Sequence, residues 1–96
     1  MSRDKIIAFL KLYKKLNQNK YHIKKMGIFG SIARNEFSND SDIDIVVELS
    51  KQDLFNLIGI KQDLENEFNK HVDIISYREN MNSFLKNRIN NEAIYV

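Results

Sequence analysis

The run DIDIVVEL at residues 42–49 restricts the possible folds more than any other part of the sequence. Its β-branched residues favour a strand of a small sheet. Because side chains alternate across a strand, Asp42 and Asp44 project from one face, with Cα atoms about 6.6 Å apart, and the apolar residues that separate and follow them project from the other. One face of the sheet can therefore pack against helices, while the opposite face carries two carboxylates at the start of the strand.

Six other segments have the patterns of regular structure, which predicts the order α-β-α-β-α-β-α along the chain. Apolar residues at three- and four-residue steps indicate a helix over about residues 3–17. A second long helix is expected to begin at Ser50, with Asp53 at the spacing of a capping box, and to run to about Asn69. The other segments are a strand at 21–30, one or two helical turns from Ser31, a strand at 71–76 and a helix from about Asn80.

The lengths of the connections predict how the three strands pair. The short connection after the first strand allows the first two strands to lie side by side and antiparallel, whereas the long helical connection after the second suits a parallel, right-handed crossover. We therefore expect an α/β (α+β) fold with a small mixed three-stranded sheet flanked by helices. In this arrangement the end of the first strand and the starts of the other two meet at one end of the sheet.

The composition suits a single domain over residues 1–96, because no repeat, low-complexity tract or linker interrupts the pattern. With 43% hydrophobic and 29% charged residues the chain is globular rather than disordered. The absence of cysteine excludes a disulfide scaffold and a thiolate metal site. Since no apolar run is long enough to cross a bilayer and no signal-peptide pattern is present, we expect a cytoplasmic protein without membrane contact.

Three polar motifs fall at the end of the sheet where the strands are expected to meet. Asp42, Asp44 and Asp73 would share one face, and like charges this close need a cation between them. Mg²⁺ prefers oxygen ligands, and two such ions about 3.5–4 Å apart are the usual clamp for displacement at phosphorus. Gly30 allows the backbone to approach a ligand closely, and Ser31 can donate a hydrogen bond to a phosphate. Together the motifs predict a site for a nucleoside triphosphate and metal ions.

Each motif taken alone also has a simpler structural explanation. A Gly-Ser pair before a helix is usually a turn with an N-cap, an Asp-x-Asp pair is common at strand starts, and Asp73 could simply end an edge strand. His22 and His71 are interpreted as surface histidines near strand ends and are left out of the site, although His71 shares a face with Asp73. Only the joint placement of the motifs favours the functional interpretation.

The string GSIARNEFSNDSDID, with ten residues between Ser31 and Asp42 and a later VDII, resembles the minimal nucleotidyltransferases (MNT domains) of the DNA polymerase beta superfamily. The resemblance covers nearly the whole chain and implies the nucleotidyltransferase fold. Arg34 matches a recurrent arginine of the family and is assigned to the nucleotide-binding site. The chain departs from the family pattern at Ile32 and Asn35, where members often have a large or basic residue and a glycine, but neither position is a metal ligand.

The resemblance implies a role for each motif. Gly30 and Ser31 would bind the triphosphate of the incoming nucleotide, and Asp42 and Asp44 would ligate two Mg²⁺ ions. Asp73 would ligate the metal nearer the attacking hydroxyl and help to deprotonate it. All three acids are present, which argues against an inactive relative.

Minimal proteins of this kind resemble the antitoxin half of a toxin–antitoxin pair whose toxin is an all-helical HEPN protein. This implies an enzyme that transfers AMP from ATP to a hydroxyl of its partner, expected to be a tyrosine, within a hetero-oligomer. One alternative is a non-catalytic antitoxin that neutralises the toxin by binding alone. A nucleic-acid-binding protein ranks last: residues 1–25 hold eight basic residues and one acid, but the lysines fall between apolar helical positions and suit a solvated face.

Overall fold

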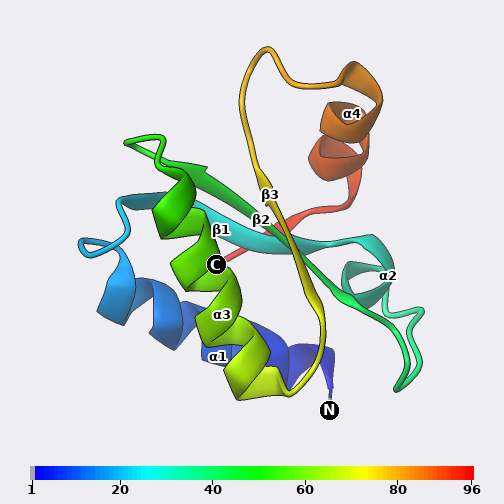
Figure 1. The fold of residues 1–96 in the computed structure, drawn as a ribbon. Coiled ribbons are helices and arrows are strands. Elements are labelled where there is room, and N and C mark those ends of the chain that lie inside the picture. Colours follow the sequence, from blue (N-terminus) through cyan, green and yellow to red (C-terminus); the bar gives the residue numbers. More distant parts are fainter. Residues whose placement is uncertain (1) are drawn as a thin grey trace.

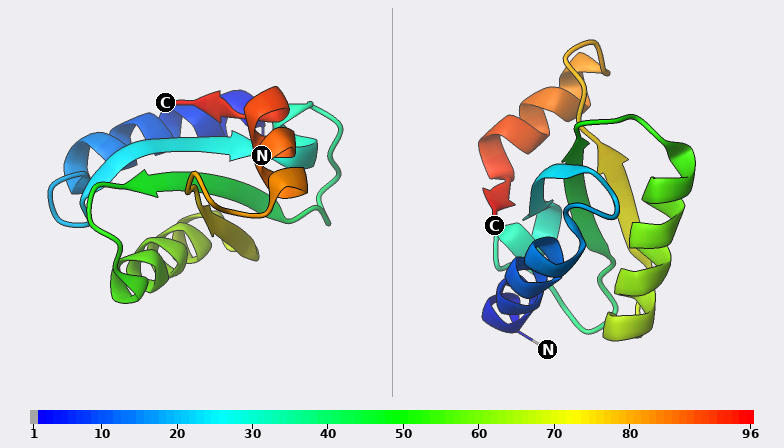
Figure 2. Two further views of the ribbon diagram at one scale, coloured as in Figure 1. Left: turned by 90° about the horizontal axis from the view of Figure 1, so that it is seen from above. Right: turned by 90° about the vertical axis from the view of Figure 1, so that its left-hand side faces the viewer.

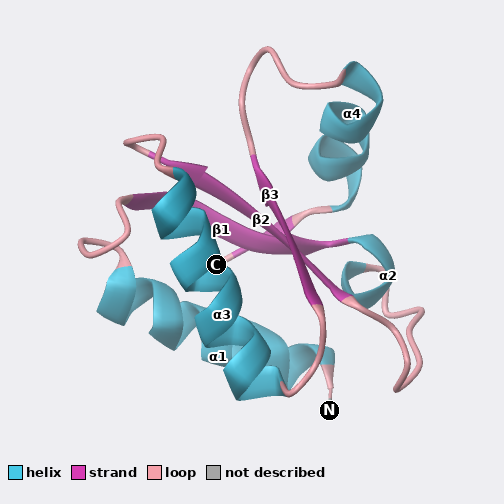
Figure 3. Cartoon of the chain, in the orientation of Figure 1, coloured by secondary structure: helices cyan, strands magenta, loops and turns pink. Residues whose placement is uncertain are grey.

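The computed structural model describes residues 2–96 and confirms the mixed α/β fold. Its elements are α1 (Arg3–Asn17), β1 (Ile23–Phe29), α2 (Gly30–Ala33), β2 (Ile43–Leu49), α3 (Leu54–Phe68), β3 (Val72–Ser76), α4 (Ser83–Glu92) and β4 (Ile94–Tyr95), as drawn in Figure 1. Figure 3 separates the helices and strands from the loops, including the long loop that joins α2 to β2. None of the helices in residues 2–96 is both long and apolar enough to cross a membrane.

The strands form a sheet in the order β3-β2-β1-β4. As the connection lengths predict, β1 pairs with β2 antiparallel and β2 pairs with β3 parallel. The sheet has one strand more than the three expected, because β4 pairs antiparallel with the free edge of β1. A Cβ atom on Gly27 would lie 2.5 Å from the carbonyl oxygen of Ile94, so the glycine allows the two strands to approach.

Helices α1 and α3 pack on one face of the sheet and form the main core with it (Figure 2). The isoleucines and valine that alternate with the acids of β2 point into this core, as predicted. Its fully buried members from helices and strands include Ile6, Leu10, Met26, Ile28, Ile43, Ile45, Val47, Ile60, Leu64 and Val72.

Helix α4 covers the middle of the opposite face. Its Ile89 is fully buried against Phe29 of β1 and Val46 of β2 in a second, smaller core. Asp44, Val46 and Glu48 are alternate residues of β2 and share this face. Because α4 covers Val46, Asp44 lies on one side of the helix and Glu48 on the other.

Two helix starts differ from the sequence-based expectation. The N-cap of α3 is Asp53, whose carboxylate accepts a hydrogen bond from the amide of Phe55 at 2.8 Å. Ser50 instead lies against the carbonyl oxygen of His22, to which both its amide and its hydroxyl donate. Helix α4 begins at Ser83 with Asn82 as its N-cap, slightly later than the expected start.

Candidate active site

The three predicted acids meet at one end of the sheet. In the parallel pairing of β2 and β3, Asp44 lies directly opposite Asp73. Asp42 immediately precedes β2, and its carboxylate, an imidazole nitrogen of His71 and the carboxylate of Asp73 lie within 4.8 Å of one another. Asp42, Asp44 and Asp73 therefore lie together because β2 and β3 start side by side, as the topology predicts.

The charge of Asp44 is only partly compensated. Burial raises the pKa of its carboxyl above the usual range, and the negative charges of Asp73 and Asp42 raise it further, while the guanidinium of Arg88 offsets part of the effect. A half-buried carboxylate next to two others is destabilised unless a cation joins it. The oxygen donors thus fit a hard divalent ion.

Gly30 and Ser31 start α2 at the edge of the acid cluster. Gly30 has φ of +74°, in the left-handed region, and a Cβ atom there would lie 2.2 Å from Oδ2 of Asp44. Only a glycine can occupy this position without displacing the carboxylate. Ser31 is half-buried beside it. The backbone of this turn is therefore in direct contact with a predicted metal ligand.

Arg34, at the end of α2, is held by two carboxylates. Its guanidinium pairs with Glu36 at 3.2 Å and with Glu92 of α4, and these hydrogen bonds, Glu36 first, raise the pKa of Arg34. The arginine thereby connects α2 to α4. Its predicted contact with the nucleotide stays a prediction.

A cavity of about 300 Å³ opens beside Asp44 and Asp73. It has an apolar wall and two cationic side chains, Lys61 from α3 and Arg88 from α4. Arg88 lies over the ring of Phe29, 5.8 Å from its centroid. Sequence patterns could not identify these two cations, because both come from helices whose position relative to the acids depends on packing. The cavity is lined by Phe29, Asp44, Lys61, Asp73, Ile74, Ile75, Leu85 and Arg88.

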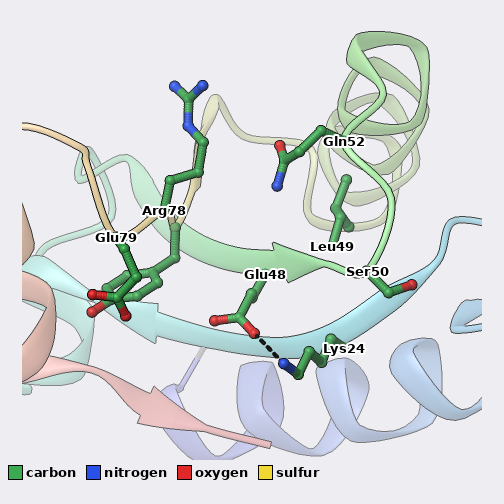
Figure 4. Close-up of a pocket in the computed structure, with 8 residues that line it drawn as sticks. Lys24, Glu48, Leu49, Ser50, Gln52, Arg78 and Glu79 are labelled. Atoms are coloured by element: carbon green, nitrogen blue, oxygen red, sulfur yellow. Dashed lines mark ion pairs between the residues drawn. The ribbon is translucent and has the colours of Figure 1, made fainter.

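A larger cavity, of about 550 Å³, lies at the opposite end of β2 (Figure 4). Figure 4 shows Glu48 turned toward Lys24, with which it forms an ion pair at 3.2 Å. This cavity holds neither the predicted acids nor the Gly30-Ser31 turn. We therefore assign the chemistry to the smaller cavity, because Asp44 and Asp73, two of the three predicted acids, line it.

Comparison with known proteins relates the whole chain to one family. The model of the family described as polymerase beta, nucleotidyltransferase matches residues 6–96. The candidate protein adenylyltransferase MJ0435 of Methanocaldococcus jannaschii is 44% identical over 78 residues, which cover 80% of this chain and 83% of the relative.

Solved structures share the fold. A minimal nucleotidyltransferase superposes with a TM-score of 0.80 at 27% identity, covering 98% of this chain and 95% of the other. A toxin–antitoxin complex with AMP-PNP gives a TM-score of 0.72 at 23% identity, covering 88% of this chain and 68% of the other. A tri-AMPylated Shewanella oneidensis HEPN toxin in complex with an MNT antitoxin gives 0.58 at 21% identity, covering 85% and 70%.

Proposed function

The chain belongs to the polymerase beta nucleotidyltransferase family, and from this premise we propose that it transfers AMP from ATP to a tyrosine hydroxyl of a HEPN-type partner protein. The observation that carries the proposal is the convergence of Asp42, Asp44 and Asp73 beside the Gly30-Ser31 turn. The relative named as a protein adenylyltransferase and the AMPylated HEPN toxin bound to an MNT antitoxin support the choice of AMP and of the partner.

The proposed reaction is an in-line displacement at the α-phosphorus of ATP. The tyrosine oxygen forms a bond to this phosphorus, the bond to the bridging oxygen of the β-phosphate breaks, and pyrophosphate leaves. Two Mg²⁺ ions, when bound, would neutralise the phosphates and polarise the reacting centre.

The residues of the chain would bind the substrates and accept the proton. Gly30 and Ser31 would hold the triphosphate through backbone amides and a hydroxyl. Asp73 would take the proton of the tyrosine hydroxyl, since it borders both the acid cluster and the cavity. Lys61 and Arg88 would attract the phosphates to the cavity.

Transfer of label from α-labelled ATP to a co-purified HEPN-type partner tests the proposal. We expect label on the partner with the unchanged chain and at least about a hundredfold less with Asp42→Asn or Asp44→Asn, because each change removes a charged metal ligand. Glu48→Gln is the matched control, since Glu48 lies on the same strand and face at the far end, and transfer should persist. Undiminished transfer by both aspartate variants would contradict the site assignment.

The same variants address neutralisation by binding alone. If Asp44→Asn forms the complex and still neutralises the partner without transferring label, neutralisation works through binding rather than catalysis. If neutralisation is lost together with transfer while the complex still forms, catalysis is required.

A further inference from the structure

His71 lies between two carboxylates at the edge of the acid cluster. Its Nδ1 atom is 3.2 Å from Oε2 of Glu65 on α3, and its Nε2 atom is 2.9 Å from Oδ1 of Asp73. It is a surface histidine near a strand end, as expected, but it is not isolated, because the packing of α3 beside β3 places Glu65 behind the ring.

Glu65 is fixed in place. The same Oε2 atom accepts a hydrogen bond from the backbone amide of Val72 at 3.0 Å, so the carboxylate is held by the strand that carries Asp73. A hydrogen on Nδ1, donated to this carboxylate, would leave Nε2 free to bind a metal ion. Nε2 faces Asp73, with Asp42 close by.

The ring nitrogen and two carboxylates lie close enough to bind one ion. Nε2 of His71 is 2.9 Å from Oδ1 of Asp73, and the ligand atoms of Asp42, His71 and Asp73 all lie within 4.8 Å of one another. Metal-binding histidines commonly have a carboxylate on the other ring nitrogen, which orients the ring and raises its basicity. His71, Asp73 and Glu65 have this relationship, and the half-exposed His71 and Asp73 leave room for water or substrate as further ligands.

We propose that Nε2 of His71 is a ligand, together with Asp42 and Asp73, of a divalent ion in the active site, and that this nitrogen strengthens the binding of Mn²⁺ more than that of Mg²⁺. The proposal rests on the proposed function for the location of the site. Mg²⁺ takes oxygen ligands almost exclusively, whereas imidazole suits later divalent metals. Glu65 is the residue that positions the ring.

Mn²⁺ binding to the intact chain tests this, with neither nucleotide nor partner present. The chain is titrated with Mn²⁺, and the electron paramagnetic resonance signal of free Mn²⁺ gives the Kd of Mn²⁺. Displacement of bound Mn²⁺ by added Mg²⁺ gives the Kd of Mg²⁺. We expect His71→Asn to weaken Mn²⁺ binding by about 10- to 100-fold and to change Mg²⁺ binding much less. The matched control is His22→Asn, which changes the other histidine, in the turn before β1, and should leave both constants unchanged.

A second measurement keeps the result interpretable if His71→Asn folds poorly. In the unchanged chain, Mn²⁺ at substoichiometric concentration should broaden the ring proton signals of His71 and leave those of His22 sharp. Equal broadening, or Mn²⁺ affinity of His71→Asn within twofold of the unchanged chain, would overturn the proposal. If Mn²⁺ selectively broadens the His71 signals but the unchanged chain transfers no AMP to its partner, the proposed function is contradicted and the metal site is not.

Discussion

The contact between Gly30 and Asp44 makes Gly30→Ala the most informative single substitution. Ordinary contact begins at 3.4 Å, and the new Cβ would lie 2.2 Å from Oδ2, so the carboxylate must withdraw by about 1.2 Å. A Mg²⁺–oxygen bond is only about 2.0–2.1 Å long, so this shift removes the ligand. An alanine at φ of +74° also costs about 1–2 kcal/mol.

Two assays separate these effects. Thermal unfolding should show a Tm lower by roughly 4–8 °C for each kcal/mol lost. Label transfer from ATP should fall by about a hundredfold or more, since a 1 Å misplacement of a catalytic group has that effect. Gly27→Ala is the control, because its new Cβ would also meet a neighbour too closely, 2.5 Å from the carbonyl oxygen of Ile94, but at the contact of β1 with β4 and not against an acid. It should lose stability without losing transfer.

Transfer by folded Gly30→Ala within a few-fold of that by the unchanged chain would contradict this expectation. That result would mean that Asp44 can move aside and still serve the reaction, or that it does not ligate the metal. Loss of transfer in both Gly30→Ala and Gly27→Ala would also contradict the expectation, because a steric clash away from the acids would then suffice.

Three further changes test the fold and the site. Asp53→Ala removes the N-cap of α3 and should lower the free energy of unfolding in urea by about 1 kcal/mol, with transfer unchanged. Tyr13→Phe removes the hydrogen bond from Tyr13 to Asp63, 2.7 Å long, and should cost about 1 kcal/mol. Burial, reinforced by Asp63, raises the pKa of Tyr13 above its usual value of 10.0, so the stabilisation by the neutral phenol is complete below that pH and is lost as the pH rises above it. Between about pH 9 and 11 the free energy of unfolding should therefore depend less on pH in the phenylalanine variant than in the unchanged chain. Mn²⁺ at about 100 times its Kd should raise the free energy of unfolding by about 2.7 kcal/mol, and Asp42→Asn should reduce this gain at the same Mn²⁺ concentration; an unchanged gain would place the ion elsewhere.

Local patterns were sufficient for most of the fold and for the acids. Alternation along residues 42–49 puts Asp42 and Asp44 on the face away from the main core, and the two connection lengths determine how β1, β2 and β3 pair. The left-handed positions at Gly30 and Asn35 fall on residue types that tolerate them. These features depend on a few neighbouring residues and on chain connectivity, so they can be predicted without knowing how the helices pack on the sheet.

The rest of the site depends on contacts between residues distant in the chain. Strand β4 has only two residues and exists because β1 offers a free edge beside Gly27. Arg88 reaches the acids only because α4 packs on the middle of the sheet.

By itself, therefore, the sequence determined β1, β2 and β3, their directions and the meeting of the Gly-Ser turn with three acids. The tertiary structure alone decided that Ser50 bonds to His22, that Glu92 pairs with Arg34, and that His71 lies between Glu65 and Asp73. Periodicity and spacing specify which way a side chain points from its own element. They do not specify which side chain of another element it meets, because that depends on how all the elements pack together.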